Sequence, residues 1–216
     1  AAYTAPSVGE YGGFGDFALE ILEQATQDID FSQFDNDGPD GRPNSGDDDG
    51  VADYVFINLV SAPRNFILSG ATGIAGLGFS ADYVTRDTGP KGGPILISGD
   101  KSRGTIFKGG TFPQTVGTMA HEFGHGLGLP DLYDLAYDNP ERDSAGIGKW
   151  GLMGQGAPGW NGDDGPNPFC AWSLEQLGWI GPNNERLVEI QRDTTGLEIS
   201  NLNLQGYVYK ITFETE

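Results

Sequence analysis

The sequence predicts a domain of the α+β class, with two main helices beside a β-sheet. Apolar residues recur at helical spacing over 14–28 and again over 112–127, which is typical of amphipathic helices. Short runs of β-branched and aromatic residues lie between these two segments and are typical of buried strands. A length of 216 residues suits one domain, or one domain with a short extension.

The first half of the chain is expected to hold one helix and several strands. The helix covers residues 14–28 and runs into an aspartate-rich loop. The segment VADYVFINLV at 51–60 then predicts a buried strand. Residues 61–93 are rich in Gly and Ser and predict no clear element. Two short strands follow, PILIS at 94–98 and GTIFKG at 104–109, and they could pair as a hairpin.

The second half of the chain is organised around the helix at 112–127. Pro113 suits the first turn of that helix, where a missing backbone N–H costs nothing. The segment FCAWSLEQLGWI at 169–180 predicts a second, buried helix that ends at Gly178. The tail predicts strands, most clearly over residues 206–213.

The composition excludes several classes of protein. The chain has 31 acidic and 12 basic side chains, for a net charge of −19. Such a surface repels nucleic-acid phosphates and anionic membranes, so neither kind of partner is expected. No apolar run approaches about 18 residues, so no transmembrane helix is predicted. Cys170 is the one cysteine, so no intrachain disulfide can form, and bound metal is a candidate for stabilising the fold instead.

The two histidines of the chain both lie in the stretch HEFGHGLGLPD at 121–131. Residues i and i+4 share one face of a helix, so His121 and His125 can direct ring nitrogens at one metal ion. Glu122 lies about 100° around the helix, from where its carboxylate can reach a water beside the metal. This is the arrangement of zinc hydrolases, and it predicts one catalytic Zn²⁺ with Glu122 as the general base.

A catalytic zinc needs a third protein ligand, and the chain has no third histidine. Asp131 is favoured because the stop signals Gly128 and Pro130 lie between it and His125, where the chain must turn back. Glu141 or Glu175 could serve instead, and so could Cys170 as a thiolate.

HEFGHGLGLPD resembles the extended metzincin pattern HExxHxxGxxH, with Asp in place of the last His. GLPDLYD, WGLMGQG at 150–156 and AWSLEQLGWI at 171–180 are similar to the immune inhibitor A family of secreted bacterial metallopeptidases. The resemblance implies a metzincin fold: a twisted mixed β-sheet, two main helices, and an active-site cleft over the helix that bears the histidines. It also implies that Met153 is the Met-turn methionine, beneath the metal.

The same resemblance leaves the stabiliser of the reaction's oxyanion open. Several metzincins place a Tyr two residues after the Met-turn methionine, and this chain has Gln155 there. The role could fall to Gln155, Tyr133, Tyr137 or Trp160, or to zinc alone.

Residues 35–53, DNDGPDGRPNSGDDDGVAD, predict a calcium site. From residue 28 to residue 53 there are nine aspartates against one arginine. Crowded carboxylates repel one another unless a cation neutralises them, and oxygen ligands suit Ca²⁺. One or two structural calcium ions are therefore expected. The favoured ligands are Asp35, Asp37, Asp47, Asp49 and Asp53, with Asp40 and Asp48 as weaker candidates.

These features predict a calcium-stabilised zinc metalloendopeptidase that hydrolyses protein or peptide substrates, with a rate optimum at neutral to mildly alkaline pH. A non-catalytic calcium-binding or adhesion module with a vestigial zinc site is the alternative, and the presence of Glu122 argues against it. We expect a secreted monomer. Residues 1–185 should form the catalytic domain, with an upper part to about residue 128 and a lower part after it. Residues 186–216 should form a β-rich extension that could begin a further domain. The N-terminus lacks an initiator Met and a signal peptide, as expected of part of a longer precursor.

Overall fold

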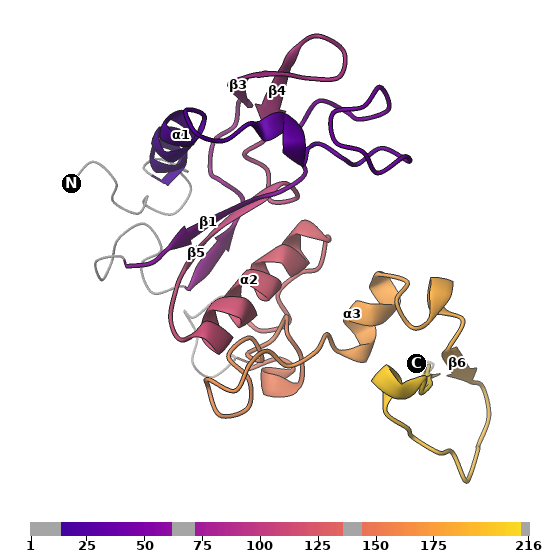
Figure 1. The fold of residues 1–216 in the computed structure, drawn as a ribbon. Helices are drawn as coiled ribbons and strands as arrows, with labels where there is room; N and C mark the ends of the chain where they lie inside the picture. Colours follow the sequence, from indigo (N-terminus) through magenta and orange to yellow (C-terminus); the bar gives the residue numbers. More distant parts are fainter. Residues whose placement is uncertain (1–13, 62–71, 136–143, 213–216) are drawn as a thin grey trace.

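A computed structural model of the chain describes residues 14–61, 72–135 and 144–212 (Figure 1). The helices are α1 (Phe14–Ala25), α2 (Phe112–Gly126) and α3 (Ala171–Gln176), and the strands are β1 (Val55–Leu59), β2 (Gly73–Ala75), β3 (Tyr83–Thr88), β4 (Pro94–Ile97), β5 (Gly104–Lys108), β6 (Leu187–Ile190) and β7 (Val208–Ile211). Short 3₁₀ turns cover Phe31–Phe34, Gly148–Trp150, Pro182–Asn184 and Leu202–Leu204. This content of helices and small sheets confirms the predicted α+β class.

The main sheet has the strand order β1-β5-β2. Strand β1 runs parallel to β5, with Ile57 opposite Ile106, and β2 runs antiparallel to β5, with Ile74 opposite Ile106. The sheet is therefore mixed, as predicted. Strand β2 lies at its edge, on the side of α2, which packs against both β5 and β2.

Helices α1 and α2 lie on opposite sides of the β1–β5 pair (Figure 1). The α1 side is the hydrophobic core, where Ile57 and Ile106 pack with Ala18 and Leu22 of α1. Successive strand residues face opposite sides, so Phe56 points the other way and meets Phe123 of α2, with ring centroids 6.1 Å apart. The alternation of side-chain direction along β1 thus places one helix on each side of the sheet.

The predicted hairpin of 94–98 with 104–109 is wrong. Both strands form, but β4 pairs antiparallel with β3, and β5 joins the main sheet. Between them, residues 99–103 carry the chain from one sheet to the other, and the Leu77 N–H donates to the carbonyl of Gly99. Strands β2 and β3 lie in the stretch for which the sequence predicted no clear element.

The predicted second helix is shorter and less buried than expected. It spans Ala171–Gln176, and Ser173 is its one buried residue. Gly178 follows with φ 72° and ends the turn as predicted. Trp172 and Trp179 are 44% and 50% exposed, which contradicts a helix enclosed in a core.

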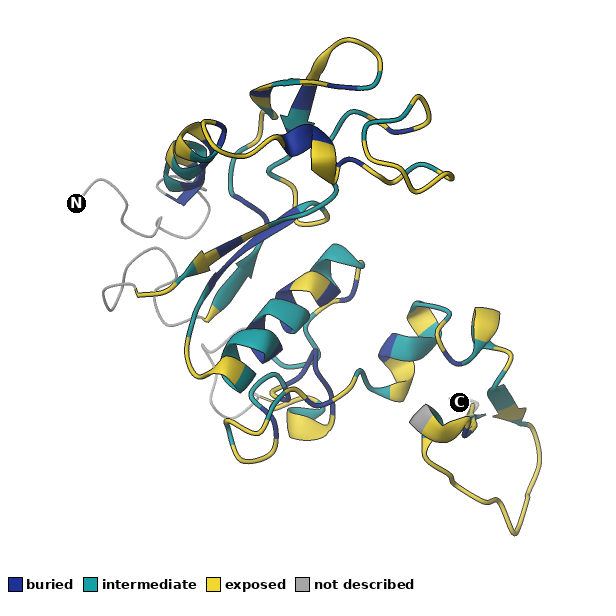
Figure 2. Ribbon diagram, in the orientation of Figure 1, coloured by how far each residue is buried: buried dark blue, intermediate teal, exposed yellow. Residues whose placement is uncertain are grey.

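The segment after α3 lies to one side of the rest of the chain and is largely exposed (Figure 2). Its strands β6 and β7 form a parallel two-stranded sheet, with Leu187 opposite Val208. The division into a catalytic domain at 1–185 and an extension at 186–216 stays a prediction. Among the described residues, no helix has the length and apolar character needed to cross a membrane.

Candidate active site

Helix α2 begins and ends at strong local signals. Thr111 caps its N-terminus and forms a reciprocal capping box with Gln114. At the other end Gly128 has φ 90°, in the left-handed region that favours glycine. The Gly128 N–H donates to the carbonyl of His125, and the Leu129 N–H donates to that of Gly124, which is a Schellman arrangement. The chain therefore turns back directly after the second histidine.

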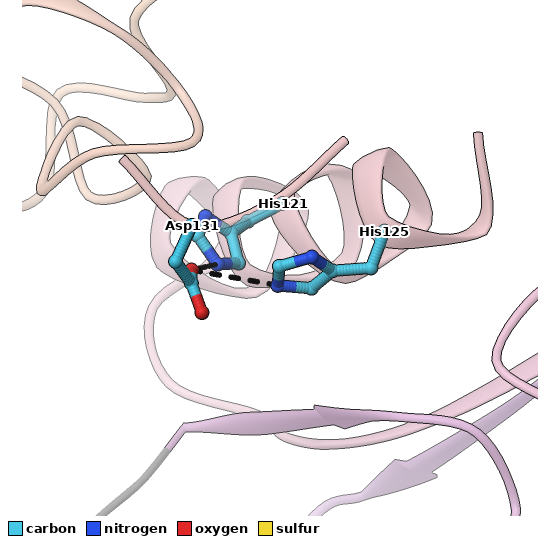
Figure 3. A group of neighbouring side chains, drawn as sticks. All are labelled: His121, His125 and Asp131. Atoms are coloured by element: carbon cyan, nitrogen blue, oxygen red, sulfur yellow. Dashed lines mark ion pairs between the residues drawn. The ribbon is translucent and has the colours of Figure 1, made fainter. Parts of the chain in front are cut away.

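This turn brings Asp131 to the two histidines (Figure 3). Asp131 Oδ1 lies 3.1 Å from His121 Nε2 and 3.4 Å from His125 Nε2. Within the described part of the chain, these three residues form one of two groups whose ligand atoms could share a metal ion. Two ligands at about 2.0–2.1 Å from a tetrahedral zinc lie about 3.4 Å apart, so the spacing fits that ion.

The hydrogen bonds of the histidines leave their Nε2 atoms as acceptors. His121 Nδ1 lies 2.7 Å from the carbonyl oxygen of Leu152, and His125 Nδ1 lies 2.8 Å from that of Leu129. A carbonyl only accepts, so each Nδ1 carries the proton and each neutral ring presents its Nε2 lone pair. The buried Asp131 Oδ1 also lacks a hydrogen-bond donor. Three acceptors that converge in this way call for a cation between them.

The charges of the site agree with this interpretation. Burial alone would lower the pKa of His121 and His125, but the adjacent Asp131 carboxylate raises both above the ordinary value. Burial alone would raise the pKa of Asp131, but the two histidines hold it far below its usual range. A metal ion must therefore compete with a proton for these three side chains.

Glu122 lies beside this cluster, 7% exposed. Burial raises the pKa of its carboxyl, and the two neighbouring histidines partly offset that rise. A cavity of about 640 Å³ opens here, lined by His121 and Glu122 and also by Gly73, Tyr133 and Gln155. A larger cavity of about 790 Å³ lies beside α1 and contains none of the predicted site residues.

The loop after residue 150 packs tightly under α2 through two glycines of the helix. Met153 is fully buried, and a Cβ on Gly124 would lie 2.4 Å from its sulfur. A Cβ on Gly117 would lie 1.8 Å from the carbonyl oxygen of Ala157. Gly117 and Gly124 therefore let the loop approach closely enough for Leu152 to accept the hydrogen bond from His121. Neither glycine was predicted from the sequence to have this role, although Gly124 stands inside the HEFGH motif.

Comparison with known proteins places this site in a family. The family described as "Immune inhibitor A peptidase M6, catalytic domain" matches residues 15–181. The chain belongs to this family. It is 34% identical to immune inhibitor A of Bacillus thuringiensis subsp. alesti over an alignment of 174 residues that covers 74% of this chain and 23% of that protein. It is 29% identical to the pre-pro-metalloprotease PrtV of Vibrio cholerae serotype O1 (strain M66-2) over an alignment of 176 residues that covers 73% of this chain and 18% of that protein.

The chain thus spans about a fifth of the length of these relatives. No solved structure matches it. Membership of the M6 family and the name of the Vibrio relative support a metallopeptidase, and the family implies a metal. The predicted resemblance to immune inhibitor A is confirmed.

The alternative third ligands in the M6 domain lie elsewhere or outside the described residues. Glu175 Oε1 pairs with Lys210 Nζ at 2.5 Å. Cys170 Sγ lies 3.4 Å from Ser173 Oγ, at the N-terminus of α3. Glu141 falls outside the described residues, so Asp131 is the described candidate that meets the histidines.

Two of the four residues predicted as candidates for oxyanion stabilisation line the cavity, and one makes its contact elsewhere. Tyr133 and Gln155 line the cavity beside Glu122, and the Tyr133 ring centroid lies 6.5 Å from that of His121. Trp160 instead packs edge-on against Trp150 at 4.9 Å. Tyr137 falls outside the described residues.

The second metal-capable group lies in the acidic loop and joins Asp35, Asp37 and Asp49, whose ligand atoms lie within 4.8 Å of one another. Asp35 is fully buried and its Oδ1 has no hydrogen-bond partner, while its Oδ2 accepts the N–H of Gly50 at 3.1 Å. The Arg103 guanidinium reaches the rim of this group and lies 2.7 Å from Asp49. Arg103 was not predicted from the sequence to contact this loop, because it lies more than 50 residues further along the chain than Asp49.

The other predicted calcium ligands accept hydrogen bonds from backbone N–H groups of the loop instead. Asp53 accepts the Asn36 N–H at 3.2 Å, and Asp47 accepts the Asp40 N–H at 3.2 Å. Asp48 is fully buried and accepts from Gly38 and Ser45 at 2.8 and 2.6 Å. Asp47 and Asp53 are therefore not part of the three-carboxylate group.

Proposed function

We propose that this M6 domain is a secreted zinc endopeptidase with a metzincin fold and Glu122 as its general base. The observation that carries the proposal is the convergence of His121, His125 and Asp131 on one point, beside a buried glutamate and an open cavity. Zinc fits this donor set because nitrogen and carboxylate ligands at tetrahedral spacing are its usual partners. A purely structural site would not need the glutamate.

Each residue of the site has a distinct task in this proposal. His121, His125 and Asp131 would hold the zinc, and the Leu152 and Leu129 carbonyls orient the two rings. Zinc bound there would supply Lewis acidity for the scissile carbonyl and the attacking water. Glu122 accepts the proton of that water and then donates it to the leaving amine. Met153 would be the Met-turn residue beneath the site, and Gln155 or Tyr133 could donate to the developing oxyanion.

Removal of zinc tests this proposal. Treatment with a chelator should abolish cleavage of denatured casein, because the three ligands alone supply no Lewis acid. Zinc added to about one equivalent should restore cleavage. Mass spectrometry of the fragments should show cuts within the chain rather than stepwise loss from its ends. The absence of any cleavage by the zinc-loaded, calcium-supplied protein would contradict the proposal.

One calcium ion at Asp35, Asp37 and Asp49 would complete the proposed enzyme. Two observations support it: three carboxylates converge, and a fully buried carboxylate oxygen of Asp35 lacks a partner. Buried carboxylate oxygens without a donor are costly unless a cation neutralises them. The ion would tie the segment after α1 to the start of the main sheet.

Calcium should raise the melting temperature more at pH 7.5 than at pH 5. Burial, reinforced by Asp48 and Asp49, raises the pKa of Asp35 to about 6. Without calcium, this group contributes stability at low pH that is lost as the pH rises through about 6. Calcium binds the ionised form, so saturation to 100 times Kd at pH 7.5 should add roughly 5–10 °C.

Asp35→Asn should remove this calcium shift in scanning calorimetry, and it should stabilise the calcium-free protein at pH 7.5. The control is Asp163→Asn, which removes one exposed charge outside both sites. A calcium shift that survives in Asp35→Asn, or that is equal at both pH values, would rule out this site.

A further inference from the structure

Gly73, in the edge strand of the main sheet, lies directly against the side chain of Glu122. A Cβ built on Gly73 would lie 2.4 Å from Glu122 Oε1 and 2.5 Å from its Cγ. Both distances are far below van der Waals contact. The φ of Gly73 does not lie in the left-handed region, so its backbone would accept other residues. Lack of a side chain, rather than backbone freedom, therefore explains the close approach of this glycine to the glutamate.

The geometry of β2 explains what the glutamate gains from this approach. Residues Thr72 and Gly76 bond to β5: the Lys108 N–H donates to Thr72, and the Gly76 N–H donates to Gly104. Residues of an antiparallel pair alternate in the direction of their backbone groups, so Gly73 and Ala75 direct theirs away from the partner strand. Strand β2 is the edge strand, so the Ala75 N–H points away from β5 to the open edge of the sheet, where it can donate to the Glu122 carboxylate and so lower the pKa of that group.

The structure assigns Gly73 and the backbone of Ala75 a positioning role: together they hold the Glu122 carboxylate against the edge strand, aimed at the attacking water. This inference rests on the proposed zinc-peptidase function. The three atoms nearest to a Cβ at position 73 all belong to the side chain of Glu122, so the least costly response is movement of that side chain. The fold and the three metal-binding residues would stay in place. Loss of catalysis without loss of zinc is therefore the signature of this role.

Gly73→Ala tests the inference, with Gly93→Ala as the matched control. Gly93 is exposed, and a Cβ there would have no atom within 4 Å. An internally quenched peptide, chosen from the casein cleavage sites, gives kcat and KM. Displacement of a catalytic group by about 1 Å can cost 100-fold in rate. Gly73→Ala should therefore lower kcat by roughly 10- to 100-fold, with KM, zinc content and melting temperature close to those of the control.

A crystal structure of zinc-loaded Gly73→Ala gives a readout besides activity, and it should show the Glu122 carboxylate moved away from the Ala75 N–H. A kcat equal to that of Gly93→Ala would overturn the inference, and so would an unmoved carboxylate. A loss of activity that follows a loss of zinc or a drop in melting temperature would also overturn it. Inactivity of both the wild type and Gly93→Ala would count against the proposed peptidase function itself. That outcome differs from those that overturn the positioning role of Gly73, so the two failures can be distinguished.

Discussion

Glu122→Gln should abolish measurable peptide hydrolysis and leave zinc bound. The amide has nearly the same shape as the carboxylate but cannot accept a proton from water. The lost general-base step is worth about 100- to 10,000-fold in rate. The zinc content should stay at one per chain, because Glu122 is not in the group that His121, His125 and Asp131 form. Metal analysis and a fluorogenic peptide assay on the same samples check both parts.

The fold of this variant should survive because the amide keeps the packing of Glu122 against β2. The control is Glu20→Gln, an exposed change of the same type on α1. It should match the wild type in activity, zinc content and melting temperature. Full activity of Glu122→Gln would remove the general base from the mechanism, whereas loss of zinc would make Glu122 part of the metal site.

The sequence predicted the helix at the centre of the site because its signals are local. Helix α2 is capped by Thr111 and has Pro113 in its first turn, and the chain turns back at Gly128; all three residues lie within ten residues of the motif or inside it. The spacing of His121 and His125 follows from helical geometry alone. The placement of Asp131 could be argued in advance for the same reason, since it depends on a short turn with strong stop signals.

The edge strand beside Glu122 could not be predicted in this way. Strand β2 has three residues, two of them small, and carries no hydrophobic pattern of its own. Its position depends on β5, whose paired residues lie 30 to 34 positions further along the chain. The hairpin prediction failed for a related reason. Short apolar runs show that strands exist but not which partner each one chooses, and β5 pairs with the distant β1 rather than with β4.

The individual cation ligands of the acidic loop could not be predicted from the sequence either. Its charge predicted a bound cation, but composition does not show which of its carboxylates converge on one point. In the structure Asp35, Asp37 and Asp49 converge, while Asp47 and Asp53 bind backbone N–H groups. Aspartates in turns often bond to nearby backbone in this way, so only the path of the chain separates the two roles.

Asp131→Asn should cost most of the zinc affinity. The substitution keeps the size of the side chain but removes the charge and one acceptor from a group of three ligands. Loss of a partner outside the ligand shell already costs up to about 100-fold in affinity, so loss of a ligand should exceed that. Competition with a chromogenic zinc chelator measures the affinity, and activity should fall in parallel. Asp163→Asn controls for the loss of one negative charge.

The protonation of the metal-free protein gives a second, independent readout of Asp131. Burial lowers the pKa of both histidines, but the Asp131 carboxylate outweighs it and raises both values. In the metal-free wild type the histidines therefore contribute stability at low pH that is lost as the pH rises through the raised values. Asp131→Asn should flatten this pH dependence in the metal-free melting curve, because the amide offers no charge to the protonated rings. Zinc and the proton compete for the same Nε2 lone pairs, so one substitution should weaken both. Retention of zinc in Asp131→Asn together with its loss in Glu141→Gln would instead make Glu141 the third ligand.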